Sequence, residues 1–305
     1  MPGKTGPAVV CYGEVLWDLL PSGEKPGGAP MNVSYHVGRL GSSASLITRV
    51  GKDELGSRLL GVLGDLQVDT SFVQIDDKVP TGIVHANPNA AGEVEYDIVA
   101  PAAWDYIERT DEVAALVSAA EYFVCGSLVN RDQKSRSTLF DLISSAKNVV
   151  LDINLRPPHY NKEIVRQLLE KADVLKMNIA ELELITGWFS DHQAVAERMK
   201  FVQDKFDIRS VIVTMGGDGA VINYKGEFLR HSGYLVTVED TVGSGDSFLA
   251  AMLYKELSGA SPQEALTFAS ALGALVASKA GGCPAYEKSE IVAIIGKQGT
   301  GIVPV

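Results

Sequence analysis

The sequence predicts an α/β fold in which a mainly parallel sheet carries helices on both faces. Short apolar runs that read as strands alternate along the chain with segments whose apolar residues recur at helical spacing, and this alternation is typical of parallel sheets. A length of 305 residues with 46% hydrophobic content suffices for one large core. We therefore expect one domain that spans residues 1–305.

The predicted strands are apolar stretches bounded by glycine or polar turns, and they cover residues 9–20, 44–50, 122–126, 149–153, 174–177 and 211–215. The predicted helices, several with Asp, Asn or Pro near the start, cover residues 30–40, 54–66, 111–119, 132–146, 162–171, 193–206, 248–257 and 265–280. Ligands of such sheets collect at the carboxyl ends of the strands. The loops that follow the strands are therefore the candidate site.

One region departs from the alternation of strand and helix. Residues 81–88 and 93–100 are short alternating segments, and the turn-forming run 89–92 joins them. This pattern predicts a β-hairpin. Composition alone leaves open whether the hairpin is an ordinary sheet edge or covers a binding site.

Composition narrows the classes of partner. The net charge of -11 argues against a nucleic-acid surface and favours a small-molecule partner. Cys11, Cys125 and Cys283 are odd in number and far apart, so they read as reduced thiols. No signal-peptide pattern opens the chain and no apolar run is long enough to span a bilayer. We expect a soluble, cytoplasmic protein with no membrane partner.

The most informative motif covers residues 240–248, in which Gly243 and Gly245 lead into Asp246 where a helix is predicted to begin. Unpaired amides at a helix start can hold an anion, and glycines let the backbone approach it closely. A carboxylate beside a phosphate site suits a base that removes the proton from an attacking hydroxyl. The alternative is an ordinary helix start in which Asp246 is only a cap.

This motif resembles the second signature of the ribokinase-like (PfkB) sugar and nucleoside kinases, Asp-Thr-x-Gly-Ala-Gly-Asp, with Ser244 in place of the usual Ala. Residues 27–34 together with Leu40-Gly41 resemble the first signature of that family. The resemblance spans residues 13–284, so the chain is identified as a member. It implies the ribokinase-like three-layer fold. The implied catalytic residues are Asp246, Gly243, Ser244 and Gly245.

The resemblance also implies a sugar site beneath a small β lid, which about residues 14–31 and 80–105 would contribute. Asp18 lies in an apolar setting, where a carboxylate needs a polar ligand or donor, although a strand-end surface residue is the alternative. Arg156 follows a strand, and its fork can grip phosphate or sugar oxygens. The implied sugar-binding residues are Asp18, Gly28, Asn32, Trp104 and Arg156.

A glycine-rich turn follows the strand at 211–215, and it would let the backbone approach a nucleotide, although it can equally form a tight hairpin turn. In the resembling family this turn contacts ATP, and the implied nucleotide-binding residues are Thr214, Gly216, Gly217, Gly219 and Gly281. Asn178 and Glu181 match the Asn-x-x-Glu motif of the family, which implies Mg²⁺ held through water. Alone, this spacing is also that of a helix capping box. A monovalent cation such as K⁺ is a further candidate.

Within the family, residues 13–19, 103–105 and 154–157 look most like bacterial fructokinases. The resemblance therefore implies an ATP-dependent kinase that converts fructose to fructose 6-phosphate. A 2-keto-3-deoxygluconate kinase or a ribokinase is the alternative, and a catalytically silent sugar-binding regulatory protein is the alternative from another class. A homodimer through the lid strands is a further candidate, because exposed strand edges invite pairing.

Overall fold

The computed structural model describes residues 6–20, 23–88 and 94–303. The strands among these residues are β1 Val9–Tyr12, β2 Leu16–Leu20, β3 Gly23–Gly27, β4 Ala44–Gly51, β5 Val73–Asp76, β6 Gly82–Pro88, β7 Val94–Ile98, β8 Tyr122–Gly126, β9 Val149–Asp152, β10 Val174–Asn178, β11 Ser210–Thr214, β12 Ala220–Tyr224, β13 Glu227–His231 and β14 Ile302–Val303. The α-helices are α1 Ala29–Arg39, α2 Glu54–Asp65, α3 Asp111–Ala119, α4 Gln133–Ile143, α5 Lys162–Leu169, α6 Ile179–Gly187, α7 Val195–Phe206, α8 Ser244–Leu257, α9 Pro262–Ala277 and α10 Lys288–Gln298.

The larger sheet has ten strands in the order β14-β13-β12-β11-β10-β9-β8-β1-β4-β5. All neighbours from β11 to β5 pair in parallel, and β12, β13 and β14 add an antiparallel edge. The predicted α/β class with a mainly parallel sheet is therefore confirmed.

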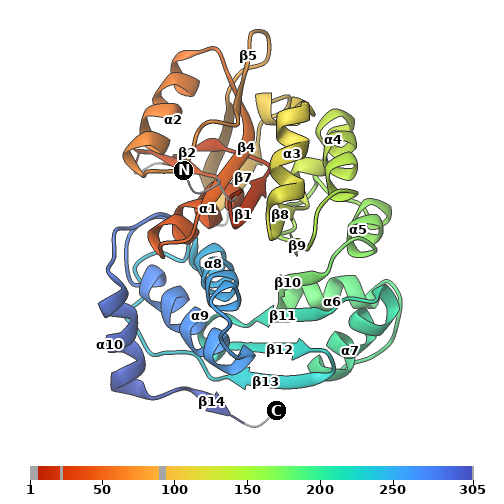
Figure 1. Cartoon of the computed structure of the whole chain (residues 1–305), viewed down its shortest axis with the longest axis vertical. Coiled ribbons are helices and arrows are strands. Elements are labelled where there is room, and N and C mark those ends of the chain that lie inside the picture. Colours follow the sequence, from red (N-terminus) through yellow and green to blue (C-terminus); the bar gives the residue numbers. More distant parts are fainter. Residues whose placement is uncertain (1–5, 21–22, 89–93, 304–305) are drawn as a thin grey trace.

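Two hydrophobic cores lie on opposite faces of this sheet. Along β1, Val9 and Cys11 belong to the core beneath α1, α8 and α9, whereas Val10 and Tyr12 belong to the core beneath α3 to α7. Successive side chains of a strand point to opposite faces, so a strand buried on both sides must be apolar throughout. Figure 1 shows the two helical layers, with α1, α8, α9 and α10 on one side and α3 to α7 on the other.

The predicted single strand over residues 9–20 is wrong, because it forms two strands in different sheets. β1 ends at Tyr12, and Gly13 then has a φ of 147°, a value that L side chains rarely adopt. The chain turns there and re-enters a strand as β2. The helix predicted over 248–257 also begins earlier, at Ser244, so the motif at 243–246 forms its first turn.

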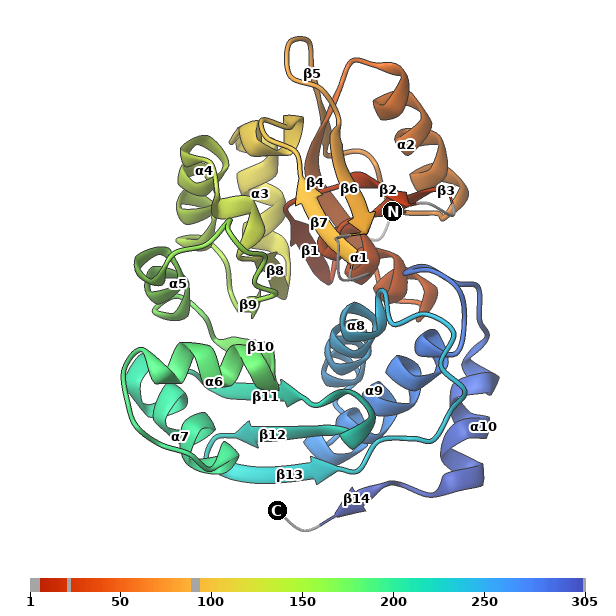
Figure 2. The same ribbon diagram turned by 180° about the vertical axis from the view of Figure 1, so that it is seen from behind.

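The smaller sheet has four strands in the order β3-β2-β6-β7. β6 and β7 pair antiparallel, as expected for the predicted hairpin, whose turn at 89–92 lies outside the described residues. β2 pairs with β3 antiparallel and with β6 in parallel. Figure 2 shows β6 and β7 at the front, next to β4 and above α8. We call this four-stranded unit the lid sheet.

Candidate active site

A cavity of about 1290 Å³ opens at the carboxyl ends of β9, β10 and β11, between the lid sheet and the start of α8. Ligands of open α/β sheets bind at this end of the strands. Every residue predicted for the site lines this cavity except Trp104. The lid sheet supplies one wall, which includes Leu16, Asp18, Val84 and Ile98.

The turn before α8 has the geometry expected of an anion site. Gly243 has a φ of 74°, and a Cβ there would lie 2.6 Å from the Cα of Gly282, so only glycine fits. The amide of Ser244 donates to the carbonyl of Thr241 at 3.3 Å, but the amides of Gly245 and Asp246 have no acceptor within the described part of the chain. Two free donors at the positive end of a helix suit a phosphate.

Ser244, which stands where the resembling signature has Ala, ties two helices together. Its Oγ donates to the carbonyl of Gly273 in α9 at 3.0 Å. The hydroxyl therefore points into the contact between α8 and α9, and Ser244 can serve the anion site through its backbone.

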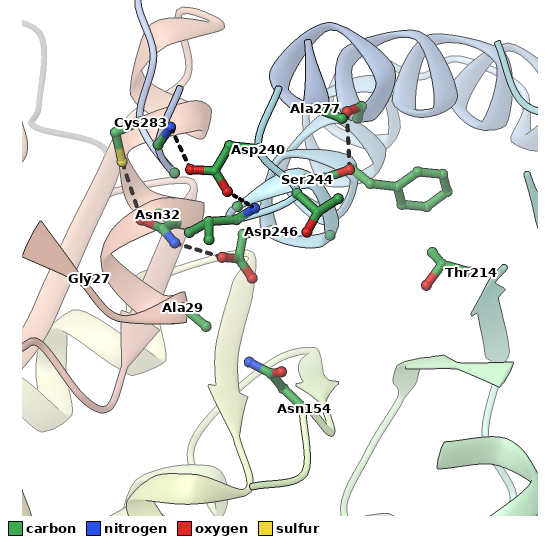
Figure 3. Close-up of a pocket in the computed structure, with 18 of the residues that line it drawn as sticks. Gly27, Ala29, Asn32, Asn154, Thr214, Asp240, Ser244, Asp246, Ala277 and Cys283 are labelled. Atoms are coloured by element: carbon green, nitrogen blue, oxygen red, sulfur yellow. Dashed lines mark hydrogen bonds between the residues drawn. The ribbon is translucent and has the colours of Figure 1, made fainter. Parts of the chain in front are cut away.

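Asp246 lies in the first turn of α8 and is only 9% exposed. Asn32 Nδ2 donates to its Oδ2 at 2.7 Å, as Figure 3 shows. Burial and then the charge of Asp152 raise the pKa of Asp246 to about 6, although Lys176, Asn32 and Arg156 oppose this shift. A carboxylate with this pKa is mostly ionised at neutral pH and still readily accepts a proton.

A buried ion pair that was not predicted from the sequence lies near Asp246. Lys176 Nζ is 2.6 Å from Asp152 Oδ2, and their side chains are 7% and 6% exposed. Burial alone would lower the pKa of Lys176, but the charges of Asp152 and Asp246 raise it overall. Lys176 also passes beneath Gly245, where a Cβ would lie 3.2 Å from its Nζ. The feature of the sequence that could have indicated this pair is a lysine inside an otherwise apolar strand.

The residues predicted for the sugar, other than Trp104, gather where β2, α1 and the loop after β9 meet. Asp18 lies in β2, and burial raises its pKa, whereas Arg156 and Lys25 lower it. Gly28 has a φ of 126°, and a Cβ there would collide with the carbonyl of Glu14. Arg156 is exposed in the cavity, and its guanidinium donates only to the carbonyl of Leu155 among the described residues.

Trp104 lies elsewhere, fully buried in the core. The guanidinium of Arg131 stacks on its ring at 3.9 Å, and Arg131 also binds both carboxylate oxygens of Asp105 at 2.8 Å. Arg131 further donates to the carbonyls of Ile98 and Val99 at the end of β7. The position of Trp104 therefore suits a residue that, together with Arg131, supports the end of β7 in the lid sheet rather than one that contacts a ligand.

Of the residues predicted for a nucleotide, Thr214, Gly216, Gly217 and Gly219 line the cavity at and after the end of β11. Gly281 also lines it, but next to Gly282, where a Cβ would lie 3.0 Å from Asn32 Nδ2. Figure 3 shows Thr214 on the far side of Asp246 from Asn32. Gly219 has a φ of 86°, and a Cβ there would collide with the carbonyl of His231. Leu235 and Val238 also line the cavity and are 90% and 59% exposed, although sequence reasoning missed them. Apolar side chains in a loop were the only signal for these two.

Asn178 and Glu181 form a helix capping box at the start of α6. Asn178 Oδ1 accepts from the amide of Glu181 at 2.9 Å, and Glu181 Oε2 accepts from the amide of Asn178 at 2.8 Å. Glu181 Oε1 accepts from the amide of Leu155 at 2.7 Å. Both residues still line the cavity, so their remaining lone pairs can accept from water.

Over residues 6–20, 23–88 and 94–303, no group of three or more His, Cys, Asp or Glu is placed to hold a metal directly. A magnesium ion usually keeps several waters and takes few protein ligands. The positions of Asn178 and Glu181 therefore fit an ion that they hold through water.

Fold and site together define a class. One cavity contains a buried carboxylate, the start of a helix, several polar side chains and a glycine-rich turn, as a kinase that transfers a phosphoryl group between two small molecules requires. None of the helices in the described ranges is both long and apolar enough to cross a membrane.

Comparison with known proteins gives the family. A model of the pfkB family carbohydrate kinases matches residues 10–289. The probable fructokinase-2 of Arabidopsis thaliana is 30% identical over 91% of this chain and 92% of its own length. A fructokinase of Escherichia coli is 29% identical over 79% of this chain and 81% of its own. The chain therefore belongs to the pfkB family of carbohydrate kinases, which are phosphotransferases that act on sugars.

A solved structure agrees in fold over almost the whole chain. A double mutant of the fructokinase from Vibrio cholerae O395, in a form bound to fructose, ADP and potassium ion, superposes with a TM-score of 0.80 at 26% identity. The match covers 95% of this chain and 99% of that one.

Proposed function

We propose that this protein is a fructokinase, which transfers the γ-phosphoryl group of ATP to the primary hydroxyl of fructose and releases fructose 6-phosphate and ADP. The observation that carries the proposal is the place of Asp246, a buried carboxylate beside two free helix amides in the middle of one cavity. The names of the similar proteins support fructose as the sugar, and the fructose and ADP of the Vibrio cholerae structure support the two substrates.

The sugar end positions the acceptor hydroxyl. Asp18 accepts from sugar hydroxyls, Asn32 both donates and accepts, and Arg156 donates to sugar or phosphate oxygens. The backbone of Gly28 completes this edge, because no side chain stands between it and the cavity. The contact between Asn32 and Asp246 couples the sugar site to the base.

Asp246 takes the proton as the hydroxyl oxygen attacks the γ-phosphorus. The new bond joins that oxygen to phosphorus, and the bond from phosphorus to the β–γ bridging oxygen breaks. ADP leaves with the electron pair of the broken bond. The amides of Gly245 and Asp246 stabilise charge on the phosphoryl group as it transfers, and such fixed donors need no reorganisation during the reaction.

The nucleotide occupies the other end of the cavity. Thr214 and the turn at Gly216, Gly217 and Gly219 let the backbone approach it, and Gly281 lines the same cavity. The exposed side chains of Leu235 and Val238 offer an apolar surface for the base of the nucleotide, because aliphatic groups pack on its flat face.

Asn178 and Glu181 would orient a magnesium ion through water, and a bound magnesium ion would neutralise phosphate charge. A requirement for a monovalent cation such as K⁺ is supported by the potassium-bound neighbour. It is tested by activity in potassium against sodium salts.

The lid sheet would exclude water from the transferring group. Lys25 Nζ on β3 lies 3.4 Å from Oδ2 of Asp240, so this pair connects the lid sheet to the segment that precedes α8. β3 and β7 are the two edges of this sheet, which supports a homodimer through the lid strands. Light scattering tests that dimer. The three free cysteines support a cytoplasmic location.

One assay distinguishes the proposed fructokinase from two alternatives, a kinase for another sugar and a catalytically silent sugar-binding protein. A 2-keto-3-deoxygluconate kinase or a ribokinase would use the same base with another sugar. A silent sugar-binding protein is disfavoured by the intact Gly243, Gly245 and Asp246. The assay is ADP release from ATP and magnesium with fructose, ribose, 2-keto-3-deoxygluconate, glucose and adenosine. Dominant turnover of fructose supports the proposal, and dominant turnover of another sugar replaces it. Sugar binding without any turnover would favour the silent protein.

A further inference from the structure

Glu14 is a further buried carboxyl residue of the cavity, close to Gly28, which is predicted for the sugar. It lies in the short connection between β1 of the large sheet and β2 of the lid sheet, and it is only 4% exposed. It lines the cavity, but its Oε2 is buried and has no hydrogen-bond partner among the described residues. Buried polar oxygens are nearly always hydrogen-bonded, so this atom calls for a donor that the chain itself does not supply.

The rest of the Glu14 carboxyl group has a structural role. The backbone amides of Glu14 and Ala29 favour its ionised form. Ala29 is the first residue of α1, and Gly28 before it has no side chain with which to cap that helix. The carboxyl group of Glu14 therefore supports the start of the helix that carries Asn32. This role leaves Oε2 free.

The surroundings of Glu14 place its carboxyl group nearer the residues predicted for the sugar than those predicted for the nucleotide. The carbonyl of Glu14 packs against Gly28, one of the residues predicted for the sugar. The charge of Arg156 favours the ionised carboxyl, and the charge of Asp246 opposes it. Glu14 lines the cavity, so a donor to its carboxyl group can come from there, where a sugar offers several hydroxyl groups.

We propose that Glu14 is a specificity residue whose carboxyl group accepts a hydrogen bond from a sugar hydroxyl other than the one that is phosphorylated. The inference deepens the proposed function and rests on it. A site built to bond a hydroxyl rejects an analogue that lacks it, because the buried acceptor is then left unpaired. Glu14 thereby favours sugars with a hydroxyl at the matching carbon.

The test pairs variants of Glu14 with sugars that each lack one hydroxyl. We would measure KM and kcat for wild type, Glu14→Gln and Glu14→Ala with fructose and with each of its monodeoxy derivatives that keeps the phosphorylated hydroxyl. The matched control is Glu24→Gln, on the surface of the lid sheet, where Glu24 pairs with Arg58. Melting temperatures and the affinity for ATP report any damage to α1.

With fructose, Glu14→Ala should raise KM roughly 10- to 100-fold, the range expected for a hydrogen bond to a charged group, with a smaller effect on kcat. With the deoxy derivative that lacks the hydroxyl bound by Glu14, the KM of Glu14→Ala should lie within about twofold of the wild-type KM. The reason is that the partner of Glu14 is then already missing in the wild-type complex. Glu24→Gln should match wild type with every sugar. Glu14→Gln keeps the shape of the side chain and an acceptor oxygen but loses the charge, so it should show a smaller loss of the same pattern and serves if the alanine variant does not fold.

An equal loss with every deoxy derivative would overturn the inference, because it would assign Glu14 to the support of α1 or to a bound water. An unchanged KM for fructose in both variants would overturn it as well. Failure of the proposed function would be seen separately, in wild-type protein that does not turn over fructose. The comparison would then use deoxy derivatives of the sugar that the substrate panel identifies.

Discussion

Replacing Lys176 with Met removes the positive member of the buried ion pair beside the base. Lys176 and Asp152 are 2.6 Å apart, and each side chain is less than a tenth exposed. The substitution would leave Asp152 buried without its only hydrogen-bond donor among the described residues. Breaking a buried pair by removing one partner costs about 3–5 kcal/mol. We expect the free energy of unfolding to fall by about that amount.

The same substitution should act on catalysis. Lys176 favours the ionised form of Asp246, so its loss should raise the pKa of Asp246 above the present value of about 6. The rise of kcat/KM with pH should therefore move to higher pH in Lys176→Met.

Urea denaturation of the ligand-free protein measures the stability, and pH profiles of kcat/KM measure the effect on the base. Lys176→Met combined with Asp152→Asn should recover most of the lost stability, because no unpaired charge remains. Lys200→Met removes a lysine from an exposed pair with Asp204 and should leave stability almost unchanged. A loss below about 1 kcal/mol in Lys176→Met, or no recovery in the double variant, would refute the reasoning.

Three further predictions follow from the same geometry. The kcat/KM of wild type should rise with pH through about 6, because Asp246 must be ionised to accept a proton, and a flat profile between pH 5 and 7 would count against this. Burial raises the pKa of Glu14 to about 7, so its contribution to stability is complete below about pH 4 and is lost as pH rises through 7. Urea denaturation should therefore show Glu14→Gln gaining up to about 3 kcal/mol relative to wild type between pH 5 and 8, whereas a constant difference would contradict the assignment. Trp104→Phe should lower stability by about 1–3 kcal/mol but leave KM for fructose within about twofold, and a large rise in KM would place Trp104 in contact with the sugar.

The large sheet was predictable because its strands are buried on both faces and read as apolar runs. The boundary between the two sheets was not, because residues 9–20 form one apolar stretch in sequence. The turn at Gly13 depends on a backbone angle that an apolar pattern does not encode. The lid sheet also pairs β2 with β6, far apart in the chain, and such pairing leaves no local signal.

The turn at residues 243–246 and most of the cavity residues could be predicted, because glycines and carboxylates occur there at a fixed local spacing. Lys176 and Glu14 were missed because their meaning depends on neighbours from other strands and loops. A lysine in an apolar strand is a local signal, but its role depends on Asp152 and Asp246, whose charges act on it in the folded chain. Trp104 is the opposite case, a residue predicted for the site that does not line the cavity. Its neighbour Asp105 binds Arg131 in the core, and this contact holds the segment away from the cavity.

The measurement that tests the central claim most directly is the turnover of Asp246→Asn. The amide is nearly the same size as the carboxylate and can still accept from Asn32, so fold and ligand binding should persist. We predict that kcat falls by about 10²–10⁴-fold while the dissociation constants for fructose and ATP, measured by calorimetry, stay within a few-fold of wild type. A kcat close to that of wild type would show that Asp246 is not the base.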